Sequence, residues 1–339
     1  MNEQGLRARR QTGRAEVPSS IGHINFIETE RGRVMRRKGF ITSVIETREQ
    51  ARYFIDDFVN SEIARLEHSP ELRDVTRLTV RAIVSSDLLR RGNIDSSHIE
   101  ATVRIGAING GGDYMMVYFG YNKEGRALSI DEVNTHRRNL DLINASRNME
   151  SLSEILSSPN YHGYEICRFN AGDATVQERD AVLMMLTKSF GYSKDECDYI
   201  LADPNNTIFV SRHPTDGIVG MSMAERRTVN LSDGRSMTMV EVTNATVIAP
   251  HGGNGLYGAI SAHLIRDIAS DTENRVDLVY SESNMDRPSL LHAIAMQQRH
   301  IAGILPNNSY IEGGLRTMGV MYLSRQELDA FYLGGTLRP

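Results

Sequence analysis

A glycine-rich turn between a predicted strand and a predicted helix is the part of this sequence best suited to chemistry. Residues 250–255 read Pro-His-Gly-Gly-Asn-Gly, after an apolar run at 239–248 and before apolar residues at helical spacing from Leu256. The first N–H groups of a helix have no partner inside the helix, and the helix dipole adds partial positive charge there. Glycine lets the backbone approach an anion without a Cβ in the way. The turn therefore predicts a site for an anionic group such as a phosphate.

Four motifs follow one another in the second half of the chain. They read E-V-T-N-A-T at 241–246, A-P-x-x-G-x-G-L at 249–256, G-x-L-x-N-N-x-x-I at 303–311 and G-G-x-x-x-M-x-V-x-Y at 313–322. Together they resemble the Gcn5-related N-acetyltransferase (GNAT) superfamily, and within it the beta-lysine N-acetyltransferase family. The resemblance extends more weakly back to about Tyr164 and does not reach the first 150 residues. It implies transfer of an acyl group from acetyl-CoA or another acyl-CoA to the amine of a small molecule, such as an amino acid.

The resemblance also implies which residues hold the co-substrate. The pyrophosphate and pantetheine would contact the strand end and the turn, at Val247, Ile248, Gly252, Gly253, Asn254, Gly255, Leu256 and Gly258. The superfamily's loop reads R/Q-x-x-G-x-G/A. Here Gly252 stands where Arg or Gln is usual, Gly255 keeps the middle glycine, and Tyr257 stands where a small residue is expected. Gly258 takes the small position if the helix starts one residue later.

Acyl transfer to an amine needs a deprotonated amine and a polarised thioester, held in line. In the superfamily the central strand splays from its neighbour, and a carboxylate on that strand takes the proton. The resemblance therefore implies that Glu241 is the base; an anchor for the substrate ammonium or an exposed strand residue are the alternatives. Many members carry a Tyr on the helix after the fifth strand to protonate the thiolate, but residues 289–298 hold none. His292 could substitute for it, and Glu282 is another candidate.

Four residues are predicted to contact the amine substrate: Thr243, Tyr280, Asn284 and Asn308. Turn and strand-end geometry explains Asn284 and Asn308 as well. Strand alternation would place Glu241 and Thr243 on one face and Asn244 and Thr246 on the other. We therefore expect at most one of these pairs to face the substrate.

Composition indicates an ordinary packed protein of a reducing compartment. The chain has 339 residues, of which 40% are apolar, and only two cysteines, too few for a disulfide framework. No apolar stretch approaches the ~20 residues that span a bilayer, and no apolar segment follows the Arg-rich first twenty residues. We therefore expect a cytoplasmic protein without membrane contact. The ten His are scattered without an H-x-x-x-H spacing, which predicts no metal site.

Charge is distributed unevenly. The chain carries a net charge of −5, whereas residues 1–40 hold nine basic and four acidic residues. A basic arm can attract a nucleic acid or an acidic partner such as an acyl carrier protein. Because only Phe26 and Phe40 could stack on bases there, a nucleic acid is not expected.

The patterns predict an α+β fold in four parts. Residues 1–38 form a weakly ordered basic arm with a short strand at 23–28, and residues 39–156 an N-terminal α+β domain that caps the substrate cleft or mediates dimerisation. Residues 157–326 form a GNAT-like domain with a mixed central sheet flanked by helices, and 327–339 a tail. Thr47 with Gln50 and Thr175 with Glu178 are capping-box signatures. Alternation at 100–108 and 114–121 around a glycine-rich turn predicts a hairpin.

The second half shows the element order of the acetyltransferase fold. The patterns predict strands at 164–169, 207–210, 218–225, 236–247, 275–280 and 318–323, and helices after Thr175, at 256–270 and at 288–298. Two other functions stay open. Tyr257 in the loop favours a non-catalytic binding or scaffold module, and the basic arm favours an acyltransferase that takes a carrier-protein thioester. A homodimer is compatible with either.

Overall fold

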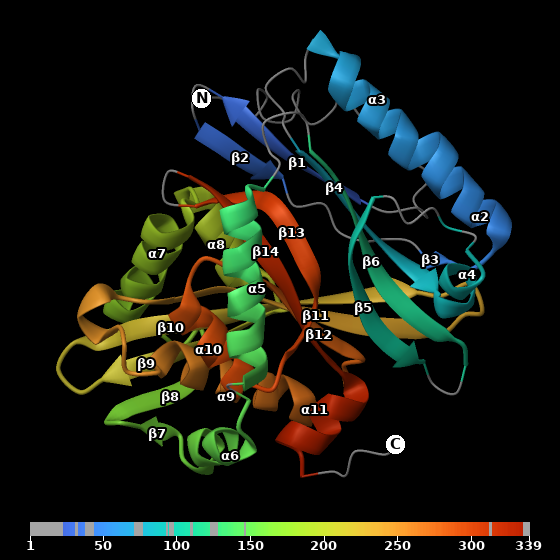
Figure 1. Ribbon diagram of the computed structural model, residues 1–339. Coiled ribbons are helices and arrows are strands. Elements are labelled where there is room, and N and C mark those ends of the chain that lie inside the picture. The colour runs from blue at the N-terminus through green and yellow to red at the C-terminus, as the bar shows by residue number, and fades with distance from the viewer. Residues whose placement is uncertain are drawn as a thin grey trace.

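The computed structural model describes residues 23–30, 33–37, 44–70, 77–92, 94, 98–108, 111–122, 128–145, 147–311 and 314–334. One mixed sheet of 14 strands runs through both halves of the chain, in the order β2-β1-β4-β6-β5-β13-β14-β12-β11-β10-β9-β8-β7, with β3 beside β4. Helices flank this sheet (Figure 1). The predicted α+β class with a mixed sheet is therefore confirmed. Among the described residues, no helix is long and apolar enough to cross a membrane.

The first half supplies six strands and a helical segment. The strands are β1 (His23–Glu30), β2 (Arg33–Arg37), β3 (Val44–Ile45), β4 (Arg77–Ser85), β5 (Ile99–Ala107) and β6 (Asp113–Asn122). The helices are α2 (Arg48–Arg52), the π-helical segment η1 (Tyr53–Val59), α3 (Asn60–His68) and α4 (Ser86–Arg90). The strand predicted at 23–28 lies within β1, but residues 1–22 of the predicted arm lie outside the described residues.

Local signals set the helices of this half. The side chain of Thr47 accepts the N–H of Gln50, and the side chain of Gln50 accepts that of Thr47, so the predicted capping box is confirmed. Phe54 and Leu66 on the helices pack against Leu78 and Val80 of β4. The segment α2–η1–α3 thus covers the outer face of the N-terminal strands (Figure 1).

Two helices lead into the second half: α5 (Ile130–Ala145) and α6 (Met149–Ser157). Asn139 of α5 donates to the carbonyl of Met285 at 2.5 Å, which fixes α5 along the molecule. Leu152 and Ile155 of α6 are buried in the core of the second half. The predicted domain boundary between residues 156 and 157 therefore falls at the end of a helix that already belongs to that core, and the division into domains stays a prediction.

The elements predicted in the second half occur in the predicted order, but the helix Lys194–Ala202 and the strand His300–Ile311 were not predicted. Its strands are β7 (Asn160–Tyr161), β8 (Tyr164–Phe169), β9 (Asn206–His213), β10 (Gly217–Asn230), β11 (Ser236–Val247), β12 (Leu278–Asn284), β13 (His300–Ile311) and β14 (Gly314–Ser324). Its helices are α7 (Val176–Phe190), α8 (Lys194–Ala202), the 3-10 turn η3 (Ala249–His251), α9 (Leu256–Ser270), α10 (Pro288–Met296) and α11 (Arg325–Tyr332). The strand predicted at 275–280 begins only at Leu278 and runs on to Asn284. Helix α11, in the predicted tail, buries Leu328 and Tyr332.

The two halves join where β5 meets β13, through the pair Gly303 and Ala101. A Cβ on Gly303 would lie 2.3 Å from the carbonyl oxygen of Glu100, so only glycine allows this approach. Beyond this seam the N-terminal strands turn back over the C-terminal ones, and residues such as Met116, Met239 and Val320 form a core between them.

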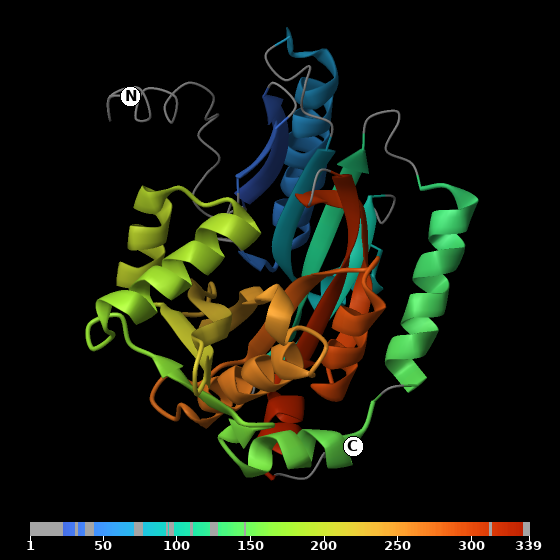
Figure 2. The ribbon, with the colours of Figure 1, turned by 90° about the vertical axis from the view of Figure 1, so that its left-hand side faces the viewer.

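The C-terminal strands carry different covers on their two faces. Val240 and Val242 of β11 pack against α9, with α6 and α11 nearby, on one face. Met221 and Met223 of β10 pack on the opposite face against α7 and α8. The N-terminal half covers this second face farther along the strands, so α7, α8 and the N-terminal strands lie on one side (Figure 2).

Candidate functional site

The turn between β11 and α9 leaves the N-terminus of α9 without a protein cap. Gly255 is the N-cap residue, with a left-handed φ of 70°; no described side chain caps the helix, and its first turn holds no acidic residue. Four other helices, α2, α7, α8 and α11, begin with capping boxes. Residues 252–255, including Gly253 and Asn254, are exposed. The turn therefore presents free amides at the positive end of a helix, as an anion site requires.

Two tyrosines border this turn. A Cβ on Gly255 would lie 2.6 Å from the hydroxyl of Tyr161, so that hydroxyl lies against the turn. Burial raises the pKa of Tyr161, which keeps the hydroxyl protonated and able to donate to an anion. Tyr257, whose pKa is raised by burial, lies near the charge of Arg299. A Cβ on Gly258 would lie 3.3 Å from the Cβ of Ala293, so the first turn of α9 packs closely on α10.

The central strand parts from its neighbour beside the turn. Strands β11 and β12 pair in parallel only over Met239–Glu241 and Leu278–Tyr280. Beyond that point β11 continues to Val247 and β12 to Asn284 without pairing to each other. The splay that the resemblance implies is therefore present. It leaves backbone groups of residues 242–247 on this side outside the ladder. Val247 and Ile248, at its end, are half-buried against the α9 core.

A β-bulge changes which side chains share a face. Met221 of β10 pairs with Thr246, whereas Met223 pairs with Thr243, so β11 holds one extra residue there. Asn244 takes a positive φ of 47°. Its amide oxygen accepts the Tyr192 hydroxyl at 3.2 Å, and Thr246 contacts Ser189 of α7 at 3.1 Å. The predicted placement of Asn244 and Thr246 on the face opposite Glu241 is wrong, because the bulge breaks the alternation.

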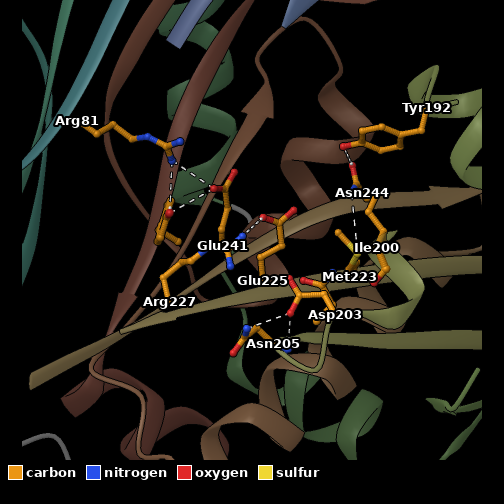
Figure 3. Close-up of polar contacts among 12 residues, drawn as sticks. Arg81, Tyr192, Ile200, Asp203, Asn205, Met223, Glu225, Arg227, Glu241 and Asn244 are labelled. Carbon is orange, nitrogen blue, oxygen red and sulfur yellow. Dashed lines mark hydrogen bonds and ion pairs between the residues drawn. The ribbon is translucent and has the colours of Figure 1, made fainter. Parts of the chain in front are cut away.

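This face of β10 and β11 carries a polar band between two apolar patches. Figure 3 shows Glu225, Arg227 and Glu241 of this band. One patch lies under α7 and contains Met221 and Met223. The other lies under the N-terminal strands and contains Val229, Met237 and Met239. The band between them consists of Glu225, Arg227, Glu241 and Thr243. Glu225 and Glu241 are directly paired across the two strands, and Arg227 Nη2 lies 3.3 Å from Glu225 Oε2.

Glu241 is bound by a cation from the first half of the chain. Arg81 Nη1 of β4 lies 3.2 Å from Glu241 Oε2 and 3.9 Å from Glu282 Oε1. The Tyr280 hydroxyl donates to Glu241 Oε2 at 3.2 Å. Burial alone would lower the pKa of Arg81, but its acidic neighbours, Tyr280 and Glu241 first among them, together raise this pKa well above its ordinary value. Arg81 therefore stays charged and favours the ionised form of Glu241.

A second contact between the halves involves Asn308. Its amide oxygen accepts Arg77 Nε and the Thr79 hydroxyl, each at 2.8 Å. Its amide nitrogen donates to Glu282 Oε2 at 3.1 Å. Asn308 thus links β4 to the same carboxylate cluster.

The remaining predicted residues lie apart from this cluster. His292 is exposed on α10, on the side of the sheet that α9 also covers. Asn284 is buried, and its side chain accepts the N–H of Asp286 at 2.9 Å, which closes the turn after β12. The roles assigned to these residues stay predictions.

Sequence reasoning missed several residues that the fold brings to the site, namely Arg77, Arg81, Tyr161, Tyr192 and Glu225. One signal was available. Residues 77–83 read R-L-T-V-R-A-I, an alternation that indicates a strand with one polar face. Nothing in the sequence indicates that this face meets Glu241 across the molecule.

No protein-family model matches the chain, and no curated protein matches it. Solved structures are similar to about half of it. NAA60 of Arabidopsis thaliana in complex with acetyl-CoA shares 9% identity, with a TM-score of 0.40, over 48% of this chain and 98% of that one. The ribosomal-protein-S18-alanine N-acetyltransferase of Escherichia coli shares 13%, with a TM-score of 0.37, over 48% and 93%. A variant of the spermidine N-acetyltransferase SpeG of Vibrio cholerae shares 15%, with a TM-score of 0.36, over 49% and 96%.

Proposed function

We propose that the chain is an N-acyltransferase that moves an acetyl or other acyl group from acyl-CoA to the amine of a small molecule. One observation carries the proposal: the uncapped N-terminus of α9 directly follows a strand that parts from its neighbour. The amides of residues 253–256 suit a pyrophosphate. The edge of β11 that parts from β12 suits an amide-containing arm such as pantetheine, because a strand edge offers backbone donors and acceptors.

The polar band supplies the amine side of the site. Glu225 and Glu241 are adjacent carboxylates on the face between α7 and the N-terminal strands. With Glu282 they make three carboxylates against the two guanidiniums of Arg81 and Arg227, a balance that favours an ammonium group over an anion at this place. Thr243 lies in the band, and Asn244 with Tyr192 borders it on the α7 side. The N-terminal half contributes Arg81, which fits a half that shapes the amine pocket.

The reaction assigns a role to each group. The ammonium group first gives one proton to Glu241, directly or through water, and the free amine nitrogen then forms a bond to the thioester carbon. The carbon–sulfur bond breaks, and the nitrogen loses its second proton to solvent or to the leaving thiolate. The CoA thiolate leaves and takes up a proton from solvent or from a nearby acid. Arg81 and Tyr280 hold the orientation of Glu241. Burial and the charge of Glu241 raise the pKa of Tyr280, so Tyr280 remains a hydrogen-bond donor.

A non-catalytic acyl-CoA-binding module is the second candidate, and one observation favours it. Glu241 and Glu282 are both buried next to Arg81, an arrangement that a structural ion cluster would also produce. The binding module and the enzyme differ in turnover alone.

The test is release of free CoA thiol from acetyl-CoA in the presence of single small amines, with and without a neighbouring carboxylate. The enzyme should release CoA only when a suitable amine is added, and the product should gain one acetyl group by mass. If the protein binds acetyl-CoA but releases no CoA with any amine, the binding module replaces the enzyme as the proposed function. Absence of acetyl-CoA binding would overturn both candidates.

A further inference from the structure

Three potential metal ligands lie close together at the start of the glycine-rich turn between β11 and α9, residues 252–255, which is called the anion turn below. His213 and Asp216 stand at the turn between β9 and β10, and His251 ends η3, directly before Gly252. His213 Nδ1 and His251 Nε2 each lie 3.2 Å from the same oxygen, Asp216 Oδ2. One ligand atom from each of the three residues lies within 4.8 Å of the other two.

The two separations between an imidazole nitrogen and Asp216 Oδ2 suit a tetrahedral metal ion. Zinc binds His nitrogen and carboxylate oxygen at about 2.0–2.1 Å, which places neighbouring ligand atoms of a tetrahedron roughly 3.3 Å apart. The two N–O distances of 3.2 Å are close to that edge length. The two His rings, 5.0 Å apart between centroids, would close slightly to share one ion.

Outer partners orient two of the three ligands. The Tyr164 hydroxyl lies 3.0 Å from His251 Nδ1, which leaves Nε2 directed at Asp216. The Thr215 hydroxyl donates to Asp216 Oδ1 at 2.9 Å, which leaves Oδ2 for the two imidazoles. It also lies 3.1 Å from His213 Nδ1, a contact that a bound ion would replace. Metal-binding His and carboxylate ligands are commonly held by such second contacts. His251 is only 7% exposed, whereas the Asp216 side chain is 50% exposed, so the cluster is anchored yet reachable from solvent.

We propose that His213, Asp216 and His251 bind one divalent late transition-metal ion, best matched by Zn²⁺. Two imidazoles and one carboxylate form the donor set of a three-ligand zinc site with an open fourth position. Mg²⁺ and Ca²⁺ prefer sites made of oxygen ligands alone. The ion would tie the β9–β10 turn to the residue before Gly252 and add positive charge beside the anion turn.

The test is titration of Zn²⁺ into the tag-free full chain after removal of metal with a chelator, followed by calorimetry. The parent should bind one Zn²⁺ per chain, and Co²⁺ should give the intense visible bands of a tetrahedral site. Asp216→Ala and His251→Gln should each weaken Zn²⁺ binding at least tenfold. His68→Ala, at the exposed end of α3, should leave it unchanged, and Mg²⁺ should not compete.

Two results would overturn the proposal. The first is no saturable Zn²⁺ binding by the parent. The second is Zn²⁺ binding that persists at parental affinity in both cluster variants, since that ion would be held elsewhere. Asp216 lies on a half-exposed turn, so its variant is expected to fold, and circular dichroism of each variant checks this.

Discussion

Arg81 and Glu241 stand 160 positions apart in the sequence and form a buried ion pair, with 3.2 Å between Nη1 and Oε2. Their side chains are 2% and 3% exposed. The pair connects the first half of the chain to the strand that borders the candidate site. Both charges are buried away from water. Removing one partner would therefore leave the other charge uncompensated and lower the free energy of unfolding.

Replacing Arg81 with Met should lower the free energy of unfolding by about 3–5 kcal/mol, because it leaves Glu241 buried without its cation. Arg90→Met is the matched control. Arg90 Nη2 also lies 3.2 Å from a carboxylate, Asp87, but its side chain is 67% exposed, and exposed pairs contribute about 0–1 kcal/mol. Urea denaturation measures the free energy of unfolding of the two variants. If the two substitutions lowered the free energy of unfolding equally, the prediction that the buried pair contributes more than the exposed one would be wrong.

Glu241→Gln should lower kcat by ~10²–10⁴, because the amide cannot accept the ammonium proton. The acid limb of the pH–rate profile, which reports protonation of the base, should flatten in this variant. Glu100→Gln is the control, since Glu100 also pairs with a buried arginine, Arg77, but lies on β5. If the Glu241 variant turns over like the parent, another residue is the base, and Glu282 is the next candidate.

Gly303→Ala should destabilise the seam between the halves by at least ~1–3 kcal/mol, the usual cost of overpacking. The added Cβ would lie within 2.6 Å of Ala101 Cα, and neither backbone can move without breaking the β5–β13 contact. Gly112→Ala, at an exposed position with open space around its Cβ, should change little. Limited proteolysis should cut the Gly303 variant between the halves faster than the parent. Cleavage at the parental rate would mean that the seam contributes little.

The stability of the chain should fall as pH falls through about 6.5, partly because of His263. Its Nε2 lies 3.0 Å from the Ile155 carbonyl and its Nδ1 3.0 Å from Arg266 Nη2. Burial, followed by the charge of Arg266, lowers the pKa of His263. The unfolded chain therefore binds the proton first, and this contribution is complete above the ordinary His pKa and is lost below it. His263→Gln should make the melting temperature less dependent on pH between about pH 7.5 and pH 5.5, whereas exposed His68→Gln should not. An equal change of melting temperature with pH in the parent and in His263→Gln would contradict this role of His263.

Local sequence signals predicted most of the strands and helices of the second half. The helix predicted at 256–270 and the strand predicted at 236–247 have these bounds in the structure. The capping box of Thr175 and Glu178 is present at the start of α7. These features depend on neighbours within a few residues, so spacing alone reveals them.

Contacts between distant segments were not predictable in this way. The pairing of Arg81 with Glu241 depends on how the two halves of the sheet face each other. The bulge at Asn244 depends on the register between β10 and β11, which the alternation of β11 alone does not contain. His213 and His251 belong to separate segments, so no ligand spacing in the sequence marked them.

Calorimetric titration of acetyl-CoA into the parent, Gly252→Val and Gly172→Val tests the central claim most directly. Gly252 has an ordinary φ of −67°, and its added Cβ would lie 3.4 Å from the Ala249 carbonyl, so the fold tolerates it. Gly172, on the loop before α7, would make the same 3.4 Å contact with Asn170 Oδ1. If the turn holds the pyrophosphate, Gly252→Val should weaken binding at least about tenfold at an unchanged melting temperature, and Gly172→Val should bind as the parent does. Equal affinity in all three proteins, or no binding by the parent, would contradict the account.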